Sequence, residues 1–220
     1  MTGNSHDPLT AARLAMVETQ LRRRGITDQR VLEAMTKVPR HEFLNRQYWP
    51  DAYADHPVPI GEQQTTSQPY IIAVMLQTAE IKPQDRVLEI GAGSGYQTAL
   101  LCELAREVFA VERYPALSTE VTQALERLGY TNATVVTGDG SLGLPEHSPY
   151  NAIIVAAAAP RVPPALLEQL APGGRIVIPV GDAQQQVLQL ARKDGAGNVS
   201  MRSLDSCRFV PLVGQQGFAA

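Results

Sequence analysis

The feature that most constrains the fold is a glycine-rich turn that directly follows a short apolar run. Residues 87–90 lead into Gly91-Ala92-Gly93-Ser94-Gly95, and an apolar segment with helical character, 96–104, comes next. Glycines in such a turn allow positive φ angles and let a ligand approach the backbone closely. In open α/β sheets, ligands bind at the carboxyl ends of the strands, which is where this turn lies. The segment therefore predicts a strand–turn–helix unit with a ligand site at the turn.

Strands and helices alternate along the rest of the chain. Further strands are expected at 108–111, 134–137, 152–156 and 175–179, and further helices at 115–128 and 164–170. The C-terminal part does not follow this alternation. It has the pattern of two strands, 186–192 and 201–210, joined by a turn at 194–198. The pattern is typical of an α/β, Rossmann-like sheet that is mostly parallel and carries one antiparallel strand near the C-terminus.

The N-terminal part is predicted to be helical. Apolar spacing indicates a helix over 9–24 that ends at Gly25, and a second helix that starts near Asp28 and stops at Pro39. Residues 1–8 are expected to fray.

The segment 46–66 contains three prolines and has no periodicity, so we expect a long ordered loop. Thr66 and Ser67 then precede a helix over 70–79 as its cap, with Pro69 in the first turn. For 220 residues we expect a single domain, with a helical cap and loop over 1–66 and a core with a C-terminal hairpin over 67–220.

Composition narrows the class of protein. Hydrophobic content is 44%, charged content is 19% and the net charge is -3, so broad electrostatic binding to nucleic acid or to a membrane surface is not expected. No apolar run approaches the ~20 residues of a membrane span. Cys102 and Cys207 form no metal-ligand spacing, so no metal is expected, and Cys102 is predicted to lie in the core. We expect a cytoplasmic monomer.

Three acidic residues follow successive predicted strands. Glu89 lies near the end of the first strand, Glu112 ends the next strand, 21 residues after Gly91, and Asp139 follows the third strand. An acid at the Glu112 position can accept hydrogen bonds from both hydroxyls of a ribose, and Asp139 would meet an adenine edge. Since no basic phosphate ligand accompanies them, the pattern favours a nucleoside without phosphates, such as S-adenosylmethionine, with Glu89 toward its cationic end.

Simpler interpretations remain open for these residues. The turn could connect a strand and a helix without a ligand, and Glu112 alone could be a solvated strand end. A nicotinamide dinucleotide is disfavoured, because its GxGxxG fingerprint requires glycine where this chain has Tyr96.

A series of short motifs runs through nearly the whole chain. In order they are Met16-Val17, Gln20-Leu21, Gly25-Ile26, Val38-Pro39-Arg40, Phe43, Gln64-Thr65-Thr66-Ser67-Gln68-Pro69-Tyr70, residues 87–97, Gly138-Asp139-Gly140, residues 152–155 and Arg208-Phe209-Val210-Pro211-Leu212. Together they resemble the protein-L-isoaspartate O-methyltransferase family. The glycine motif alone would indicate only a class I methyltransferase, whereas the segments around Ser67 and Phe209 are far more specific.

The resemblance implies a seven-stranded Rossmann-like sheet, S-adenosylmethionine as methyl donor with S-adenosylhomocysteine as product, and repair of isoaspartyl proteins or peptides. It also places Ser67 at the active site as the catalytic residue. The positions expected to bind the cofactor are Gln64, Thr65, Thr66, Glu89, Gly91, Gly93, Ser94, Gly95, Glu112, Arg113, Asp139 and Gly140. The positions expected to border the substrate are Ala157, Ala158, Pro160, Arg208 and Val210.

The sequence departs from the family pattern on the substrate side. Gln63 stands where the family usually has glycine, and Thr66 where it has an apolar residue. An alanine run replaces T-A-A-P at 156–160, and the loop after Gly140 lacks a common aromatic residue. The changes at Gln63 and Thr66 motivate one alternative, a carboxyl methyltransferase dedicated to one peptide. A further alternative is a non-catalytic S-adenosylmethionine-binding protein, against which the intact segment around Ser67 argues.

The expected reaction requires no general base. A carboxyl group with a pKa near ~4 is already ionised at neutral pH, so His6, His41, His56 and His147 are expected to be structural or at the surface. Ser67 is predicted to orient the carboxylate or the donor, with a helix cap as the alternative role. Arg208 is predicted to pair with a substrate carboxylate, with a surface salt bridge as its alternative.

Overall fold

The structure, a computed structural model, describes residues 7–219. The helices are α1 (Pro8–Met16), α2 (Gln29–Lys37), α3 (Pro69–Ala79), α4 (Tyr96–Leu104), α5 (Pro115–Arg127) and α6 (Pro164–Glu168). The strands are β1 (Val58–Pro59), β2 (Thr65–Thr66), β3 (Arg86–Ile90), β4 (Glu107–Glu112), β5 (Ala133–Thr137), β6 (Tyr150–Val155), β7 (Leu170–Gly181), β8 (Gln186–Lys193) and β9 (Val199–Cys207). Most of the segment expected to fray, 1–6, lies outside the described residues, whereas Pro8 already belongs to α1.

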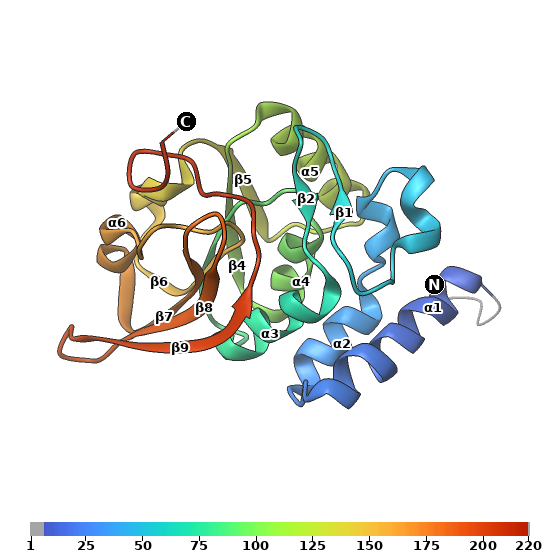
Figure 1. Cartoon of the computed structure of the whole chain (residues 1–220), viewed down its shortest axis with the longest axis horizontal. Coiled ribbons are helices and arrows are strands. Elements are labelled where there is room, and N and C mark those ends of the chain that lie inside the picture. Colours follow the sequence, from blue (N-terminus) through green and yellow to red (C-terminus); the bar gives the residue numbers. More distant parts are fainter. Residues whose placement is uncertain (1–6, 220) are drawn as a thin grey trace.

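Strands β3 to β9 form one seven-stranded sheet in the order β5-β4-β3-β6-β7-β8-β9 (Figure 1). The pairs from β5 to β7 are parallel. β8 is antiparallel to both β7 and β9, so one strand of the sheet is reversed. The predicted Rossmann-like α/β fold, with a single antiparallel strand near the C-terminus, is confirmed. The chain places β4 and β5 on one side of β3, and β6 and β7 on the other. Open α/β sheets form a crevice for a ligand at such a switch point, here between β3 and β6.

Alternate residues of the central strands pack into two apolar cores, one on each face of the sheet. In β3, Val87 belongs to one core and Leu88 to the other, and both are fully buried. The first core also contains residues of α1 to α5, and the second contains Leu166 of α6. Because side chains alternate along a strand, this arrangement covers both faces of the sheet, as its parallel part requires.

The N-terminal helix is less regular than its apolar spacing predicts. After α1, a π-helical turn (Val17–Leu21) and a 3-10 turn (Arg22–Arg24) continue the coil to Gly25. Gly25 has φ 94°, the left-handed conformation that commonly ends a helix. The second helix, α2, begins after Asp28, whose carboxylate accepts from the Arg30 and Val31 amides, and it ends before Pro39 as predicted.

The segment 46–66 is more structured than the predicted loop. It contains a 3-10 helix (Arg46–Asp51) and a two-stranded hairpin in which Val58 pairs with Thr66. Glu62 and Gln63 at the hairpin tip both have φ 57°, a region that favours glycine. Strands of two residues are too short to show a period in the sequence, which is why the hairpin was not predicted.

The prediction that Thr66 and Ser67 cap the following helix is wrong. Thr66 lies in β2, and the N-cap of α3 is Gln68, whose side chain makes no capping hydrogen bond. The amide of Tyr70 instead donates to Oδ1 of Asp55, 3.1 Å away. Since a residue 15 positions away along the chain supplies the cap, Ser67 is free of that structural role.

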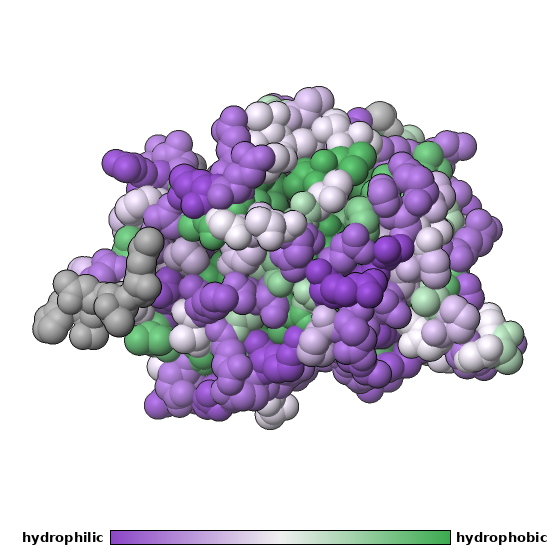
Figure 2. Space-filling view, turned by 180° about the vertical axis from the view of Figure 1, so that it is seen from behind, coloured by the Kyte–Doolittle hydropathy of each residue, from purple (hydrophilic) through white to green (hydrophobic). Residues whose placement is uncertain are grey.

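One face of the molecule is mostly polar. Figure 2 shows the face behind Figure 1, with hydrophilic residues over most of the view and a more apolar area toward its top. Within residues 7–219, no helix has both the length and the apolar character that crossing a membrane demands.

A buried arginine links β7 to the end of α3 and to the residue before β3. Arg175 of β7 donates to the carbonyl oxygens of Ala79, Glu80 and Asn151 and to Oδ2 of Asp85, which is 2.7 Å away. The side chains of Arg175 and Asp85 are 6% and 4% exposed. A charge buried in this way is tolerated only while its partner remains, because an unpaired ion loses its hydration without compensation.

We predict that Asp85→Ala lowers the free energy of unfolding by about 3–5 kcal/mol, because it leaves the Arg175 guanidinium buried and unpaired. Glu107→Ala is the matched control: it breaks the half-exposed pair with Arg86 and is expected to cost less than about 1 kcal/mol. Urea unfolding followed by circular dichroism measures both values. Equal costs for the two variants would contradict the role given to the buried pair.

Candidate active site

A cavity that is open to solvent lies at the carboxyl ends of β3, β4 and β6. Its walls are formed by four sequence-distant segments: 64–67, the glycine turn with Gln97, the end of β4 with Arg113 and Tyr114, and 210–213. Ile90, Gly140, Ala156 and Ala157 complete the lining. The cavity therefore opens at the crevice that the sheet order predicts.

Most of the residues predicted to bind a cofactor come together in this cavity. The predicted residues that line it are Gln64, Thr65, Thr66, Gly91, Gly93, Ser94, Glu112, Arg113 and Gly140, together with Ser67. Glu89, Gly95 and Asp139 are not part of its lining.

The glycine turn has the backbone conformation that its sequence predicts. The φ angles of Gly91, Gly93 and Gly95 are 86°, 56° and 85°. A Cβ atom on Gly93 would lie 3.4 Å from Cδ1 of Ile60, so the β1–β2 hairpin packs directly over the turn. A Cβ atom on Gly95 would lie 3.0 Å from Cγ1 of Val121, which shows that Gly95 serves the packing of α4 against α5.

Glu112 is the acid that faces the cavity. Its Oε2 accepts from the Gly93 amide at 2.8 Å, and its Oε1 accepts from the Tyr114 amide at 3.0 Å. The residue is only 5% exposed, so the alternative of a solvated strand end is wrong. Each carboxylate oxygen keeps a further acceptor site, which suits two neighbouring hydroxyls.

Asp139 lies beside the cavity, where it holds the C-terminal segment. Its Oδ1 accepts from the amide and hydroxyl of Ser141, and its Oδ2 accepts from the Gln215 amide at 2.7 Å. Burial alone would raise the pKa of Asp139, but the hydrogen bonds from Gln215 and Ser141 outweigh it and lower that pKa. One acceptor site remains on Oδ2 for a ligand.

Glu89 does not face the cavity. It is fully buried beneath the glycine turn, where it accepts from Nε2 of Gln97 at 3.0 Å and from Oγ1 of Thr98 at 2.5 Å. Burial raises the pKa of Glu89 to about 8, although both hydrogen bonds lower it. Gln97 lines the cavity in its place, and sequence reasoning missed this residue. The available signal was a polar side chain on the first turn of a mostly apolar helix.

Thr66 and Ser67 lie where the hairpin enters α3. Thr66 is buried, and its Oγ1 is 3.4 Å from Nη1 of Arg40. Arg40 is fully buried, and desolvation lowers its pKa to about 10. Within the described chain, its Nε and Nη2 atoms have no hydrogen-bond partner. A positive charge therefore lies directly behind the Thr66 hydroxyl.

A second hollow adjoins the cavity at Ser67. It is lined by Pro57, Gln68, Ile71, Arg208, Phe209 and by residues that also line the cavity, namely Thr65, Ser67, Ala156 and Val210. Of the positions predicted to border a substrate, Arg208 and Val210 lie in this hollow and Ala157 lies in the cavity. Ala158 and Pro160 line neither: Ala158 is fully buried and pairs with Val210 and Leu212, and Pro160 is exposed.

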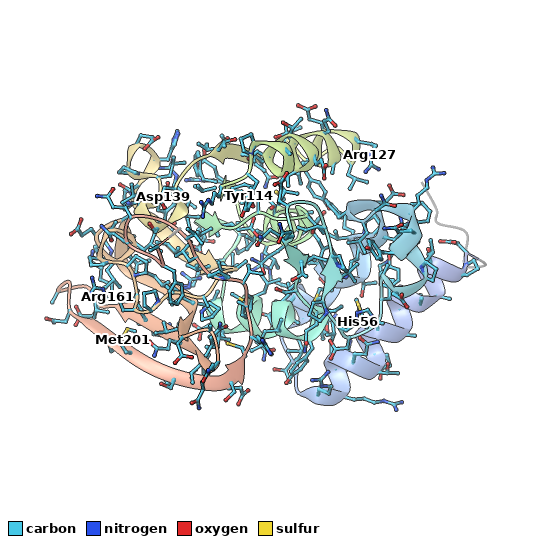
Figure 3. All side chains as sticks on the ribbon, turned by 45° about the horizontal axis from the view of Figure 1, so that its top comes forward. His56, Tyr114, Arg127, Asp139, Arg161 and Met201 are labelled. Atoms are coloured by element: carbon cyan, nitrogen blue, oxygen red, sulfur yellow. The ribbon has the colours of Figure 1, made fainter. Side chains whose placement is uncertain are left out.

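The described histidines lie outside both hollows. His41 is buried and bonds through Nδ1 to the Tyr53 hydroxyl at 2.7 Å. His147 stacks on Phe109 at 4.2 Å between ring centroids, and His56 is exposed (Figure 3). The expectation of structural or surface histidines is confirmed for these three; His6 lies outside the described residues.

The fold and the site together define a class. A parallel sheet with one reversed strand, together with a glycine turn that is hydrogen-bonded to an acid at the end of the next strand, identifies a Rossmann-like class I methyltransferase. The family model described as protein-L-isoaspartate(D-aspartate) O-methyltransferase (PCMT) matches residues 12–217. The chain belongs to this family.

Relatives and solved structures agree with this assignment. A protein-L-isoaspartate O-methyltransferase of Koribacter versatilis is 56% identical over 94% of this chain and 93% of its own, and a second, of Syntrophobacter fumaroxidans, is 51% identical over 94% and 96%. A solved protein-L-isoaspartate O-methyltransferase matches with a TM-score of 0.84 at 30% identity, covering 93% of this chain and 67% of that chain. A Plasmodium falciparum structure of a protein given the same name, in complex with S-adenosyl-L-homocysteine, has a TM-score of 0.77 at 26% identity and covers 90% and 96%.

We predict that Glu112→Gln weakens binding of S-adenosylhomocysteine by about ten- to a hundredfold. The amide presents one acceptor oxygen instead of two, so it cannot receive both backbone amides and a ribose diol. Isothermal titration calorimetry measures the affinity. Glu126→Gln, an exposed position on α5, is the control and is expected to bind like the wild type. Unchanged affinity in Glu112→Gln would contradict the placement of the ribose.

Proposed function

We propose that this protein transfers a methyl group from S-adenosylmethionine to the carboxylate of isoaspartyl residues in damaged proteins or peptides. The observation that carries this proposal is the position of Ser67, which lines both the cavity and the adjoining hollow. A donor in the first and a peptide in the second would meet at this side chain. Family membership over nearly the whole chain favours isoaspartyl repair over a single dedicated peptide.

The cavity fits an adenosyl cofactor without phosphates. Glu112 offers two acceptor sites for the ribose hydroxyls, and the Tyr114 side chain and Gly140 border the position of the base. Gln64, Thr65, Thr66 and Gln97 would hold the amino-acid end. When bound, the cofactor supplies a methyl group on a positively charged sulfur.

The protein's contribution to the reaction is positioning and exclusion of water. The attacking carboxylate is ionised at neutral pH, so no side chain has to remove a proton. Ser67 is suited to orient that carboxylate by donating its hydroxyl hydrogen. Contact between Ile60 and the glycine turn keeps the hairpin over the cavity, which limits water near the reacting groups. Such alignment of reactants at ~3–3.5 Å accelerates a displacement strongly.

Arg208 is the charged group available to a substrate in the hollow. It is exposed on the segment that follows β9, and no ion pair involving it is formed within residues 7–219. Its positive charge suits a carboxylate of the peptide. Gln63, where the family has glycine, lies at the exposed hairpin tip and lines neither hollow, so this departure does not touch the proposed site.

We also propose that the enzyme acts in the cytoplasm, as a monomer and without nucleic acid. The two free cysteines suit a reducing compartment, and the net charge of -3 does not favour polyanions. Size-exclusion chromatography with light scattering tests the monomer. The division into a cap and loop over 1–66 and a core over 67–220 likewise remains a prediction, and the shared apolar core supports one unit.

The proposed activity is tested with labelled S-adenosylmethionine and a pair of peptides that differ only in an isoaspartyl or a normal aspartyl residue. We expect base-labile methyl incorporation into the isoaspartyl peptide and little into its twin. Equal incorporation into both peptides would refute the isoaspartyl specificity. Cofactor binding without incorporation into aged proteins would indicate a non-catalytic binding protein.

We predict that Ser67→Ala lowers kcat by more than about tenfold, because the carboxylate loses the group that orients it. The circular dichroism spectrum and the affinity for S-adenosylhomocysteine are expected to stay near those of the wild type, since Ser67 does not cap α3. Ser203→Ala, on the exposed side of β9, is the matched control. An unchanged turnover number in Ser67→Ala would remove Ser67 from the mechanism.

We predict that Arg208→Ala raises KM for the isoaspartyl peptide by about five- to twentyfold and leaves kcat nearly unchanged, because it removes uniform binding energy. Arg202→Ala, an exposed arginine on β9, serves as the control with the same loss of charge. Initial-rate kinetics over a range of peptide concentrations measure both constants. A similar KM change in the two variants would show that overall charge, rather than contact with Arg208, is responsible.

A further inference from the structure

Gln186 is a buried polar residue beside the point where β9 ends. It is the first residue of β8, its backbone pairs with Cys207 at the end of β9, and it is 5% exposed. Oε1 of its side chain accepts from the Phe209 amide at 2.7 Å, and Nε2 donates to the carbonyl oxygens of Phe209 at 3.2 Å and of Asp182 at 3.1 Å. The side-chain amide therefore pairs with Phe209 as the backbone of a neighbouring strand would, beyond the last backbone pair of β9.

The two bonds to Phe209 have no substitute in the described part of the chain. Phe209 is 9% exposed and belongs to one of the two apolar cores. Within residues 7–219, neither its amide nor its carbonyl oxygen forms another hydrogen bond. Without the Gln186 amide, both buried groups would lose their partner, or the segment would move to find others. The path of the chain directly after β9 therefore depends on this side chain.

Arg208 lies between two residues that Gln186 holds. Cys207, before it, pairs with the Gln186 backbone, and Phe209, after it, is bound by the Gln186 side chain. Arg208 itself is exposed, borders the hollow beside Ser67, and forms no hydrogen bond or ion pair within residues 7–219. Its place in the wall of the hollow is therefore set by its two neighbours, and Gln186 fixes both.

The next part of the segment has a separate support. The Val210 carbonyl oxygen accepts from the Ala158 amide at 2.8 Å, and the Leu212 amide donates to the Ala158 carbonyl oxygen at 2.7 Å. Val210 and the three residues after it line the cavity, whereas Gln186 lines neither the cavity nor the hollow. Loss of the Gln186 amide is therefore expected to disturb the substrate side of the segment, while the wall of the cofactor cavity stays in place.

We propose that Gln186 is a positioning residue for the peptide substrate. By holding Cys207 with its backbone and Phe209 with its side chain, it keeps Arg208 in the wall of the hollow, where the guanidinium meets a carboxylate of the peptide. A group that is held in place before binding loses less conformational entropy on binding, so the effect falls on the affinity for the peptide. The inference rests on the proposed function and deepens it, since it concerns the peptide side of the same site.

Gln186→Met tests the inference, because it keeps the length of the side chain and removes its hydrogen bonds. We expect KM for the isoaspartyl peptide to rise about three- to tenfold, with kcat and the affinity for S-adenosylhomocysteine within about twofold of the wild type. Initial-rate kinetics and isothermal titration calorimetry on the full chain measure these values. Gln189→Met is the matched control, at a half-buried position of β8 whose side chain forms no hydrogen bond within residues 7–219, and it is expected to change none of them.

A double-variant cycle with Arg208→Ala separates positioning from general damage to the fold. If Gln186 acts through Arg208, adding Gln186→Met to Arg208→Ala is expected to raise KM by less than about twofold further, because the group to be positioned is already absent. General damage would leave the effect of Gln186→Met the same in both backgrounds.

Three results would each overturn the inference: an unchanged KM in Gln186→Met, a loss of cofactor affinity as large as the rise in KM, or independent effects in the double variant. If Gln186→Met does not fold, Gln186→Glu takes its place with the same expectations, because it keeps the size and the acceptor for the Phe209 amide but loses the donor. If the wild type methylates no isoaspartyl peptide, the proposed function fails before any variant is compared, and the inference fails with it. Wild-type activity together with an unchanged KM in the variant refutes the inference alone.

Discussion

The hydrogen bond from the Gly93 amide to Glu112 is the contact on which the site depends. It ties the glycine turn after β3 to the end of β4, and the second oxygen of Glu112 holds the start of the next loop through Tyr114. The parallel register of β3 and β4 brings these two ends together. With the carboxylate fixed on both oxygens and nearly removed from solvent, its remaining acceptor sites point in defined directions. A ligand with two adjacent hydroxyls meets a site that is already arranged.

The β1–β2 hairpin completes this arrangement from outside the sheet. It brings Ser67 to the boundary between the cavity and the adjoining hollow, and it packs on the glycine turn through Ile60. The hairpin tip accepts the left-handed conformation at Glu62 and Gln63, which costs conformational energy of the order of 1 kcal/mol per residue. That cost is tolerated because the hairpin is held by Thr66 and by the contacts of its base with the core.

Sequence patterns predicted the strands and helices that have a regular apolar period, and the turn that is rich in glycine. The β3–α4 unit, the alternation of strands and helices, and the reversed strand near the C-terminus were all predicted, since buried strands and amphipathic helices have characteristic periods. The two-residue strands of the hairpin and the Asp55 cap of α3 were not. Such features arise from contacts between segments that are distant in sequence, and no local period records them.

The sequence by itself determined the family, the sheet and the set of segments that meet at the cavity, because motif spacing fixes which residues follow each strand. Only the tertiary structure decided what each acid does. Glu112 faces the cavity, Asp139 holds the C-terminal segment, and Glu89 is buried with Gln97 in front of it. All three lie at or near the carboxyl ends of strands of the same sheet, yet their accessibility differs, because burial depends on which helix or loop covers each strand end. Desolvation and hydrogen bonding, which set the charge of these groups, follow from that covering and not from the order of residues.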